Sequence, residues 1–238
     1  MSQSNGILFS ILVIFISYSF VNTEQENQKE SLLIKHSDDF EVTGQGDNAT
    51  WEITDWVTIP QQKNDGVNFR TRVKVLYSDK GIYFLFDCQD SQIISTLKED
   101  NANLWEEDVV EVFFWTDENH PFYFEYELSP TNYELPILVP NVDGEFLGWL
   151  PWKYDGERRA RHATFIEKVD NQVLSWSAEF FIPFALLKPL SNVPPKPGTK
   201  WRANMYRIDY DKGVATWAWQ PIRTNFHDFE RFGTFVFE

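Results

Sequence analysis

The segment that most restricts the fold is residues 109–115, with the sequence VVEVFFW. Residues two apart in an extended strand point to the same side of a sheet, so this segment predicts two largely apolar faces. One face carries Val109, Glu111, Phe113 and Trp115, and the other carries Val110, Val112 and Phe114. Glu111 is thus a carboxylate among apolar neighbours. Burying such a charge is costly unless a ligand, a cation or a basic residue satisfies it.

Short segments of the same kind recur along the chain, separated by turn sequences. Residues 73–77 and 82–87 flank Ser78–Gly81 and predict a hairpin, and residues 109–115 and 122–128 predict a second one. Further β-like segments are 173–181, 200–209, 214–219 and 234–237. The only candidate helix is 183–187, which begins with proline. The sequence therefore predicts an all-β fold, an antiparallel sandwich of jelly-roll or immunoglobulin-like type with few short helices.

The N-terminus predicts a targeting segment. Residues 7–21 are almost continuously apolar, which is the length of a signal-peptide core and short for a membrane span. We expect residues 1–22 to be a signal peptide, 23–36 a polar linker and 37–238 one domain of a secreted or periplasmic protein. Residues 1–6 lack Lys and Arg, so an N-terminal membrane anchor is the alternative.

Composition limits the partners. Hydrophobic residues make up 42% of the chain, enough for a sizeable core, and the net charge of −15 disfavours nucleic acid and anionic membranes as partners. This charge suits a neutral ligand or a bound cation. Cys88 is the one cysteine, so an internal disulfide is excluded, and its place in a strand pattern predicts a buried thiol.

An ordered set of motifs resembles the family 9 carbohydrate-binding modules and the related DOMON-type β-sandwiches. The resemblance covers the chain from about Trp51 onward, and Leu104–Phe113 is its most specific part. The other matching segments are 49–51, 77–84, 87–90, 176–184, 197–199, 204–209, 226–229 and 231–233. The resemblance implies a β-sandwich that binds sugars without cutting them and that usually accompanies a glycoside hydrolase.

The resemblance also implies a binding site in which two Trp side chains clamp a saccharide end. Trp105 and Glu111 fall on the first clamp residue and its carboxylate, and Trp219 or Trp217 on the second clamp residue. Where the family has a basic sugar contact, this chain has Glu125 or Glu127. Arg207 on a neighbouring strand is expected either to replace that cation or to neutralise Glu111.

Calcium is the metal that the resemblance suggests. Ca²⁺ takes several oxygen ligands, and Asp87 and Asp90 lie in the acidic turn that resembles the family's. The four histidines have no spacing typical of a zinc site.

The leading hypothesis is a secreted, non-catalytic module for oligo- or polysaccharides of the xylan or cellulose type, including chain ends, in carbohydrate catabolism. One alternative is a haem-binding electron-transfer sandwich, with Met205 and either His162 or His227 as axial ligands. A second is a glycoside hydrolase that uses Glu111 with Glu125 or Asp108, because hydrolysis needs two neighbouring carboxylates. A third is a surface interaction domain that has lost sugar binding.

Overall fold

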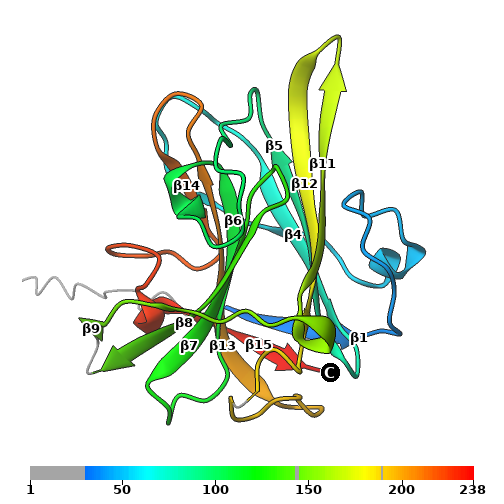
Figure 1. Ribbon diagram of the computed structural model, residues 1–238, viewed down its shortest axis with the longest axis vertical. Helices are drawn as coiled ribbons and strands as arrows, with labels where there is room; N and C mark the ends of the chain where they lie inside the picture. Colours follow the sequence, from blue (N-terminus) through cyan, green and yellow to red (C-terminus); the bar gives the residue numbers. More distant parts are fainter. Residues whose placement is uncertain (1–29, 143–144, 189) are drawn as a thin grey trace, which may run out of the picture.

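The computed structural model describes residues 30–142, 145–188 and 190–238, which form an all-β sandwich as the sequence predicts (Figure 1). Sheet A has the order β10 (Leu150–Pro151), β8 (Glu134–Val142), β7 (Phe122–Leu128), β6 (Val109–Trp115), β13 (Lys200–Asp209), β15 (Gly233–Phe237) and β1 (Ser31–His36). Sheet B has the order β1, β4 (Thr71–Tyr77), β5 (Gly81–Gln89), β12 (Gln172–Pro183) and β11 (Arg161–Val169).

Short elements complete the sheets and the loops. Strand β14 (Ala215–Ala218) pairs with β13 and with β3 (Gln61–Lys63), β2 (Val57–Thr58) pairs with β4, and β9 (Glu145–Phe146) pairs with β8. The 3-10 helices are η1 (Ala49–Ile53), η2 (Leu104–Glu106), η3 (Gly156–Arg158) and η4 (Phe229–Arg231). No helix in the described part of the chain is long and apolar enough to cross a membrane.

Both predicted hairpins are confirmed. Strands β4 and β5 pair around the turn at 78–80, and β6 and β7 pair with the bounds that the sequence predicts. The candidate helix at 183–187 forms turns instead, in which Leu186 N–H donates to Pro183 O and Leu187 N–H to Phe184 O. A proline at the end of a strand starts this turn because it cannot donate to the next ladder bond.

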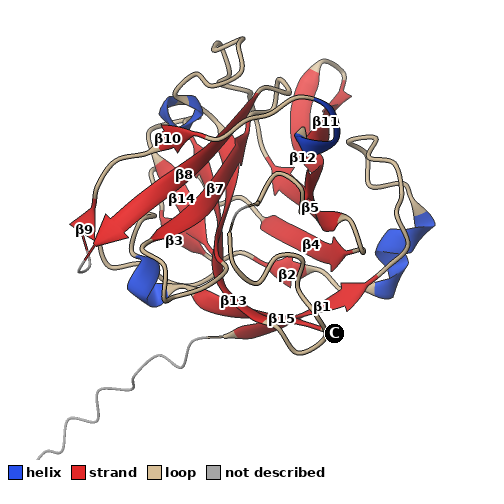
Figure 2. Ribbon diagram, turned by 60° about the horizontal axis from the view of Figure 1, so that its bottom comes forward, coloured by secondary structure: helices blue, strands red, loops and turns tan. Residues whose placement is uncertain are grey.

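Strand β1 corrects the expectation of a linker over residues 23–36. Residues 31–34 pair in parallel with β15, and Lys35 and His36 pair in parallel with β4 (Figure 2). Strand β1 therefore joins sheet A to sheet B at one edge of the sandwich. Its Ile34 side chain is fully buried in the core. The predicted signal peptide and residues 23–29 lie outside the described residues.

The core between the sheets is rich in aromatic rings. Val110, Val112 and Phe114 of β6 face it, as the alternation predicts, and Phe114 stacks on Phe84 of β5 with 6.0 Å between ring centroids. Cys88 is fully buried there, as predicted, and burial raises the pKa of its thiol.

The outer face of sheet A is apolar as well. Val109 and Phe113, on the other side of β6, belong to a second buried cluster with Tyr206 of β13. Apolar strand faces must be covered to be stable. Here η2 and the C-terminal segment around Phe229 and Phe232 pack on this face. These covering segments form the walls of the cavity described below.

We expect Ile34→Ala to lower the free energy of unfolding by about 2–4 kcal/mol, because it leaves a hole where the two sheets join. Denaturant unfolding of the purified protein measures this change. The matched control is Leu33→Ala in the same strand, whose side chain is 49% exposed and whose loss should cost within about 0.5 kcal/mol. Equal losses in the two variants would contradict the assigned role of β1.

Candidate functional site

A cavity of about 690 Å³ opens on the outer face of sheet A. Strands β6, β7, β8, β13 and β14 form its floor. The wall comes from η2, the segment 146–149, the C-terminal segment 222–227 and β3. Its lining residues are Gln62, Lys63, Trp105, Glu111, Phe113, Glu125, Glu127, Ile137, Phe146, Trp149, Ile208, Thr216, Ile222, Arg223, Thr224, Asn225, Phe226 and His227. This size is typical of a small-molecule site.

Three carboxylates meet on the cavity floor. The strand register places Glu111 of β6 directly opposite Glu127 of β7, and Phe113 opposite Glu125. The three glutamates are buried, with exposed fractions of 2%, 3% and 0% for Glu111, Glu125 and Glu127, and their closest carboxylate oxygens all lie within 4.8 Å of one another. Like charges directly opposite in a sheet destabilise it, so this arrangement works against the fold.

The carboxylates have few partners within the protein. Glu111 Oε1, Glu125 Oε2 and both oxygens of Glu127 accept no hydrogen bond of good geometry from the part of the chain that the structure describes. Burial raises the pKa of Glu125 to about 8. Burial also raises the pKa of Glu111 and Glu127 well above the usual range, with the charge of Glu125 adding to the effect on both and that of Glu111 adding to the effect on Glu127. Burial therefore favours the protonated, uncharged form of all three carboxyl groups on the cavity floor.

The basic residues of the cavity wall are paired elsewhere. Lys63 Nζ lies 3.1 Å from Asp65, and Arg223 lies 2.8 Å from Asp228. His227 Nδ1 is 3.8 Å from Glu125 Oε2, but burial lowers the pKa of His227 to about 4, so its ring is neutral at neutral pH. Among the described residues, no Lys or Arg forms an ion pair with the three glutamates.

Two tryptophans form an aromatic corner of the cavity. The rings of Trp105 and Trp149 meet edge to face with 5.9 Å between centroids, and both are half-buried. Tyr210 Oη donates to the Trp105 carbonyl at 2.7 Å, and Asp108 accepts from the backbone N–H groups of Ile94 and Tyr210 at 2.6 and 2.9 Å. The acidic run before β6 thus braces the loop that carries Trp105. Of the two Trp residues in the Pro/Gly-rich insertion, Trp149 joins the cavity and Trp152 packs against the core.

The structure does not bring Trp217 or Trp219 to this cavity. Thr216 lines it, so the next residue of β14, Trp217, faces the core, where it is 1% exposed and its indole N–H donates to Phe69 O at 3.0 Å. Trp219 packs on Phe235 in the same core. Strand alternation explains why Trp217 faces the core. The ring beside Trp105 is that of Trp149, which lies in the loop between β9 and β10.

Arg207 also lies on the core side. Tyr206 is the register partner of Glu111, so Arg207, one residue on, points to the opposite face of sheet A. Its guanidinium lies 3.0 Å from Asp90 and 2.5 Å from Asp209 and sits over the Trp217 ring. Arg207 thus neither neutralises Glu111 nor supplies a cation to the cavity.

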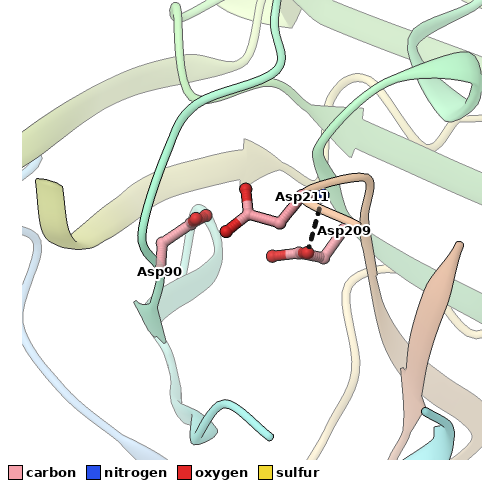
Figure 3. A group of neighbouring side chains, drawn as sticks. All are labelled: Asp90, Asp209 and Asp211. Carbon is pink, nitrogen blue, oxygen red and sulfur yellow. Dashed lines mark hydrogen bonds between the residues drawn. The ribbon is translucent and has the colours of Figure 1, made fainter. Parts of the chain in front are cut away.

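The predicted calcium ligands do not share one ion position. Asp87 accepts from Arg70 at 3.1 Å and from Arg72 at 2.6 Å. Asp90 instead groups with Asp209 and Asp211, whose carboxylates converge in Figure 3. Arg207 already bridges Asp90 and Asp209, so a guanidinium takes the place that a cation would have there. Asp87 and Asp90 thus do not fit a shared calcium ion.

The ligands of the haem hypothesis lie apart. Met205 is buried in the core between the sheets, whereas His227 lies on the cavity side, where its Nδ1 is 2.6 Å from Tyr123 Oη. His162, on β11 of the other sheet, lies 2.9 Å from Asn132 Oδ1. A haem between Met205 and His227 would have to pass through sheet A.

The C-terminal wall is the part of the site that the sequence analysis missed. Phe226 stacks on Tyr206 at 4.1 Å, and His227 stacks on Phe146 at 4.1 Å. Residues 226–229 match a motif of the family 9 modules, but this match does not indicate that the segment covers a cavity. Only the path of the chain back over sheet A shows this.

Comparisons with known proteins confirm the resemblance to the family 9 modules. Residues 42–142 match the family model described as carbohydrate family 9 binding domain-like. The fold is similar to that of a candidate carbohydrate-binding protein from Bacteroides uniformis ATCC 8492, at 16% identity and a TM-score of 0.71, covering 88% of this chain and 100% of the other. No curated protein matches the sequence.

A second similar fold is a family 9 carbohydrate-binding module from Caldicellulosiruptor kristjanssonii. Its complex with cellotriose matches at 15% identity and a TM-score of 0.63, covering 88% of this chain and 94% of the other. Its complex with glucose matches at 16% identity and a TM-score of 0.62, covering 88% and 96%.

We expect Glu125→Gln to stabilise the protein increasingly as pH rises. The pKa of Glu125 is raised from 4.5 to about 8, so between these values the unfolded chain loses a proton that the folded chain keeps. The wild type therefore loses stability relative to the variant across this window. Denaturant unfolding at about pH 5 and about pH 8 should show the advantage of the variant growing by more than about 1.4 kcal/mol, the energy of one pKa unit.

The control for this pH dependence is Glu52→Gln, which removes one exposed acidic side chain outside the cavity. Its stability relative to the wild type should stay level over the same window. A level difference for Glu125→Gln as well would contradict the described environment of the cavity floor.

Proposed function

We propose that this protein is a non-catalytic carbohydrate-binding module whose saccharide occupies the cavity on the outer face of sheet A. The observation that carries the proposal is the corner formed by Trp105 and Trp149 above a polar floor. A pyranose ring has apolar C–H faces, which pack on indole rings, and hydroxyl edges, which need hydrogen-bond partners. The cavity offers both kinds of surface side by side.

The polar groups around the cavity suit hydroxyl recognition. Gln62, Thr216 and Asn225 present amide and hydroxyl groups at the wall, and protonated glutamates on the floor can donate as well as accept hydrogen bonds. The match to the family model and the cellotriose and glucose complexes of a similar fold support an oligosaccharide of the cellulose type, and the proposal extends to xylan. The proposal includes binding at chain ends.

The electrostatics of the floor favour binding over hydrolysis. A glycosidase divides two roles between its carboxyl groups, and this division needs environments that push their pKa values apart. Here burial raises the pKa of Glu111, Glu125 and Glu127 in the same direction. The three groups thus share one kind of buried environment, which favours a binding role over a divided acid and nucleophile.

A place outside the cell suits this function. The apolar run at residues 7–21 supports a signal peptide over residues 1–22, and the net charge of −15 suits a soluble binder of an uncharged polymer. The proposed role is in polysaccharide catabolism, alongside a glycoside hydrolase that cuts the bound chain.

We expect Trp105→Ala and Trp149→Ala each to weaken saccharide binding about tenfold or more, because each removes one aromatic face of the corner. Isothermal titration calorimetry of the full chain with cellotriose, xylotriose and glucose measures the affinities. The matched control is Tyr154→Ala, an exposed aromatic residue near Trp149 in sequence that does not line the cavity. It should bind as the wild type does.

The same samples test the other functions. A folded wild type that gives no heat with any of these saccharides would refute the proposal. Release of shorter sugars from the oligosaccharides would instead make the protein a hydrolase. Equal losses in the Tyr154 and Trp105 variants would place the saccharide outside the cavity.

A further inference from the structure

We propose that the cavity is selective for a sugar with a free, positively charged amino group, which Glu111, Glu125 and Glu127 bind on the floor while Trp105 and Trp149 contact the ring. The inference rests on the proposed carbohydrate binding and names the class of saccharide. Its basis is the set of buried carboxylate oxygens that line the cavity without a partner.

The described residues leave the carboxyl oxygens of the cavity floor without hydrogen-bond partners. A buried carboxylate normally pairs with a cation or accepts several hydrogen bonds, because its desolvation is costly. Four oxygens of the three glutamates accept none, and the side chains are at least 97% buried, since their exposed fractions do not exceed 3%. A ligand that reaches the floor would relieve an existing cost, which strengthens its binding.

The N–H donors of an ammonium group match the acceptor oxygens of the cavity floor. An ammonium group has three N–H donors and no acceptor, and an ionised carboxylate only accepts. The three carboxylates converge within 4.8 Å, so one nitrogen can contact all three side chains. One positive charge also allows one carboxyl group to ionise while the others keep their protons. A neutral hydroxyl provides a single donor and no charge.

The size and the aromatic lining of the cavity favour an organic cation over a metal ion. A cavity of about 690 Å³ is far larger than an ion requires, and Phe146 and Phe226 extend the aromatic wall beyond the two tryptophans. Aromatic faces attract cations and also pack on apolar C–H groups. An amino sugar offers both a charge and C–H groups, whereas a hydrated metal ion offers only the charge. The carboxylates occupy only the floor, and the remaining wall suits the body of a sugar.

The basic side chains around the cavity do not compete for the carboxyl groups of the floor. Lys63 and Arg223 at the rim are held by Asp65 and Asp228, and the pKa of His227 is lowered to about 4 by burial. An incoming ammonium group therefore meets carboxylates without first displacing a described basic side chain.

The test compares the trisaccharide of β-1,4-linked glucosamine with its N-acetylated form and with cellotriose, by calorimetry on the full chain near pH 6. We expect the free amine to bind at least about tenfold more tightly than either neutral sugar. Glu127→Gln and Glu111→Gln should each reduce this ratio by about threefold or more. Each variant removes a carboxyl group that can ionise when the ammonium binds, with little change in side-chain size, and circular dichroism checks that both are folded.

The control variant is Glu106→Gln, which removes an exposed acid beside Trp105 that does not line the cavity. It should leave the ratio unchanged, since a preference caused only by the overall negative charge would fall equally in every acid-to-amide variant. Such an equal fall would overturn the proposal.

Two other outcomes overturn the inference in different ways. Equal affinity for the three trisaccharides would refute the amino-sugar preference and leave carbohydrate binding standing, whereas no binding of any of them would refute both. A separate calorimetric titration uses Ca²⁺ alone, without a saccharide. A calcium heat that is lost in Glu127→Gln, without an amino-sugar preference, would assign the floor to a metal ion.

Discussion

The burial of sheet A on both faces is the constraint on which the rest of the structure depends. Strands β6 and β13 lie at its centre, and their alternating side chains serve the core on one face and the cavity on the other. The register fixes this division, because Glu111 pairs with Tyr206 and Val110 with Arg207. A slip of one residue would exchange the faces and drive Glu111 into the core, so the core locks the site in place.

The same division explains how the fold tolerates unfavourable electrostatics. Within the described ranges, the charged groups on one face of sheet A make no ion pair with those on the other face. On the core face, Arg207 is satisfied by Asp90 and Asp209, while on the cavity face no Lys or Arg of the described residues pairs with the three glutamates. Aromatic packing on both faces stabilises the sheet enough to hold carboxylates opposite one another. Groups that oppose the fold and lie in a cavity are typical of binding sites.

Much of the architecture could be predicted from local patterns, and the exceptions have identifiable causes. Strands β6, β7 and β13 have the predicted bounds because their alternation is strong. Strand β8 was missed because Pro136 and Pro140 lack the N–H that a strand normally donates. Strand β1 is hard to predict because its three apolar residues, Leu32, Leu33 and Ile34, follow a long polar run and show no alternation. It forms only because β15 and β4 offer edges on which it can pair.

Which side chains share a face of a strand follows from the sequence alone, since the period of two is a property of the extended backbone of one strand. That was enough to place Glu111 apart from Val110, whereas the resemblance to the family 9 modules indicated Trp105. Only the tertiary structure decided which face became a cavity and which aromatic residue stands beside Trp105. Trp149 reaches it, and Glu127 meets Glu111, through strand register and loop paths that join distant segments. Such contacts depend on how the whole chain packs, and no local pattern encodes them.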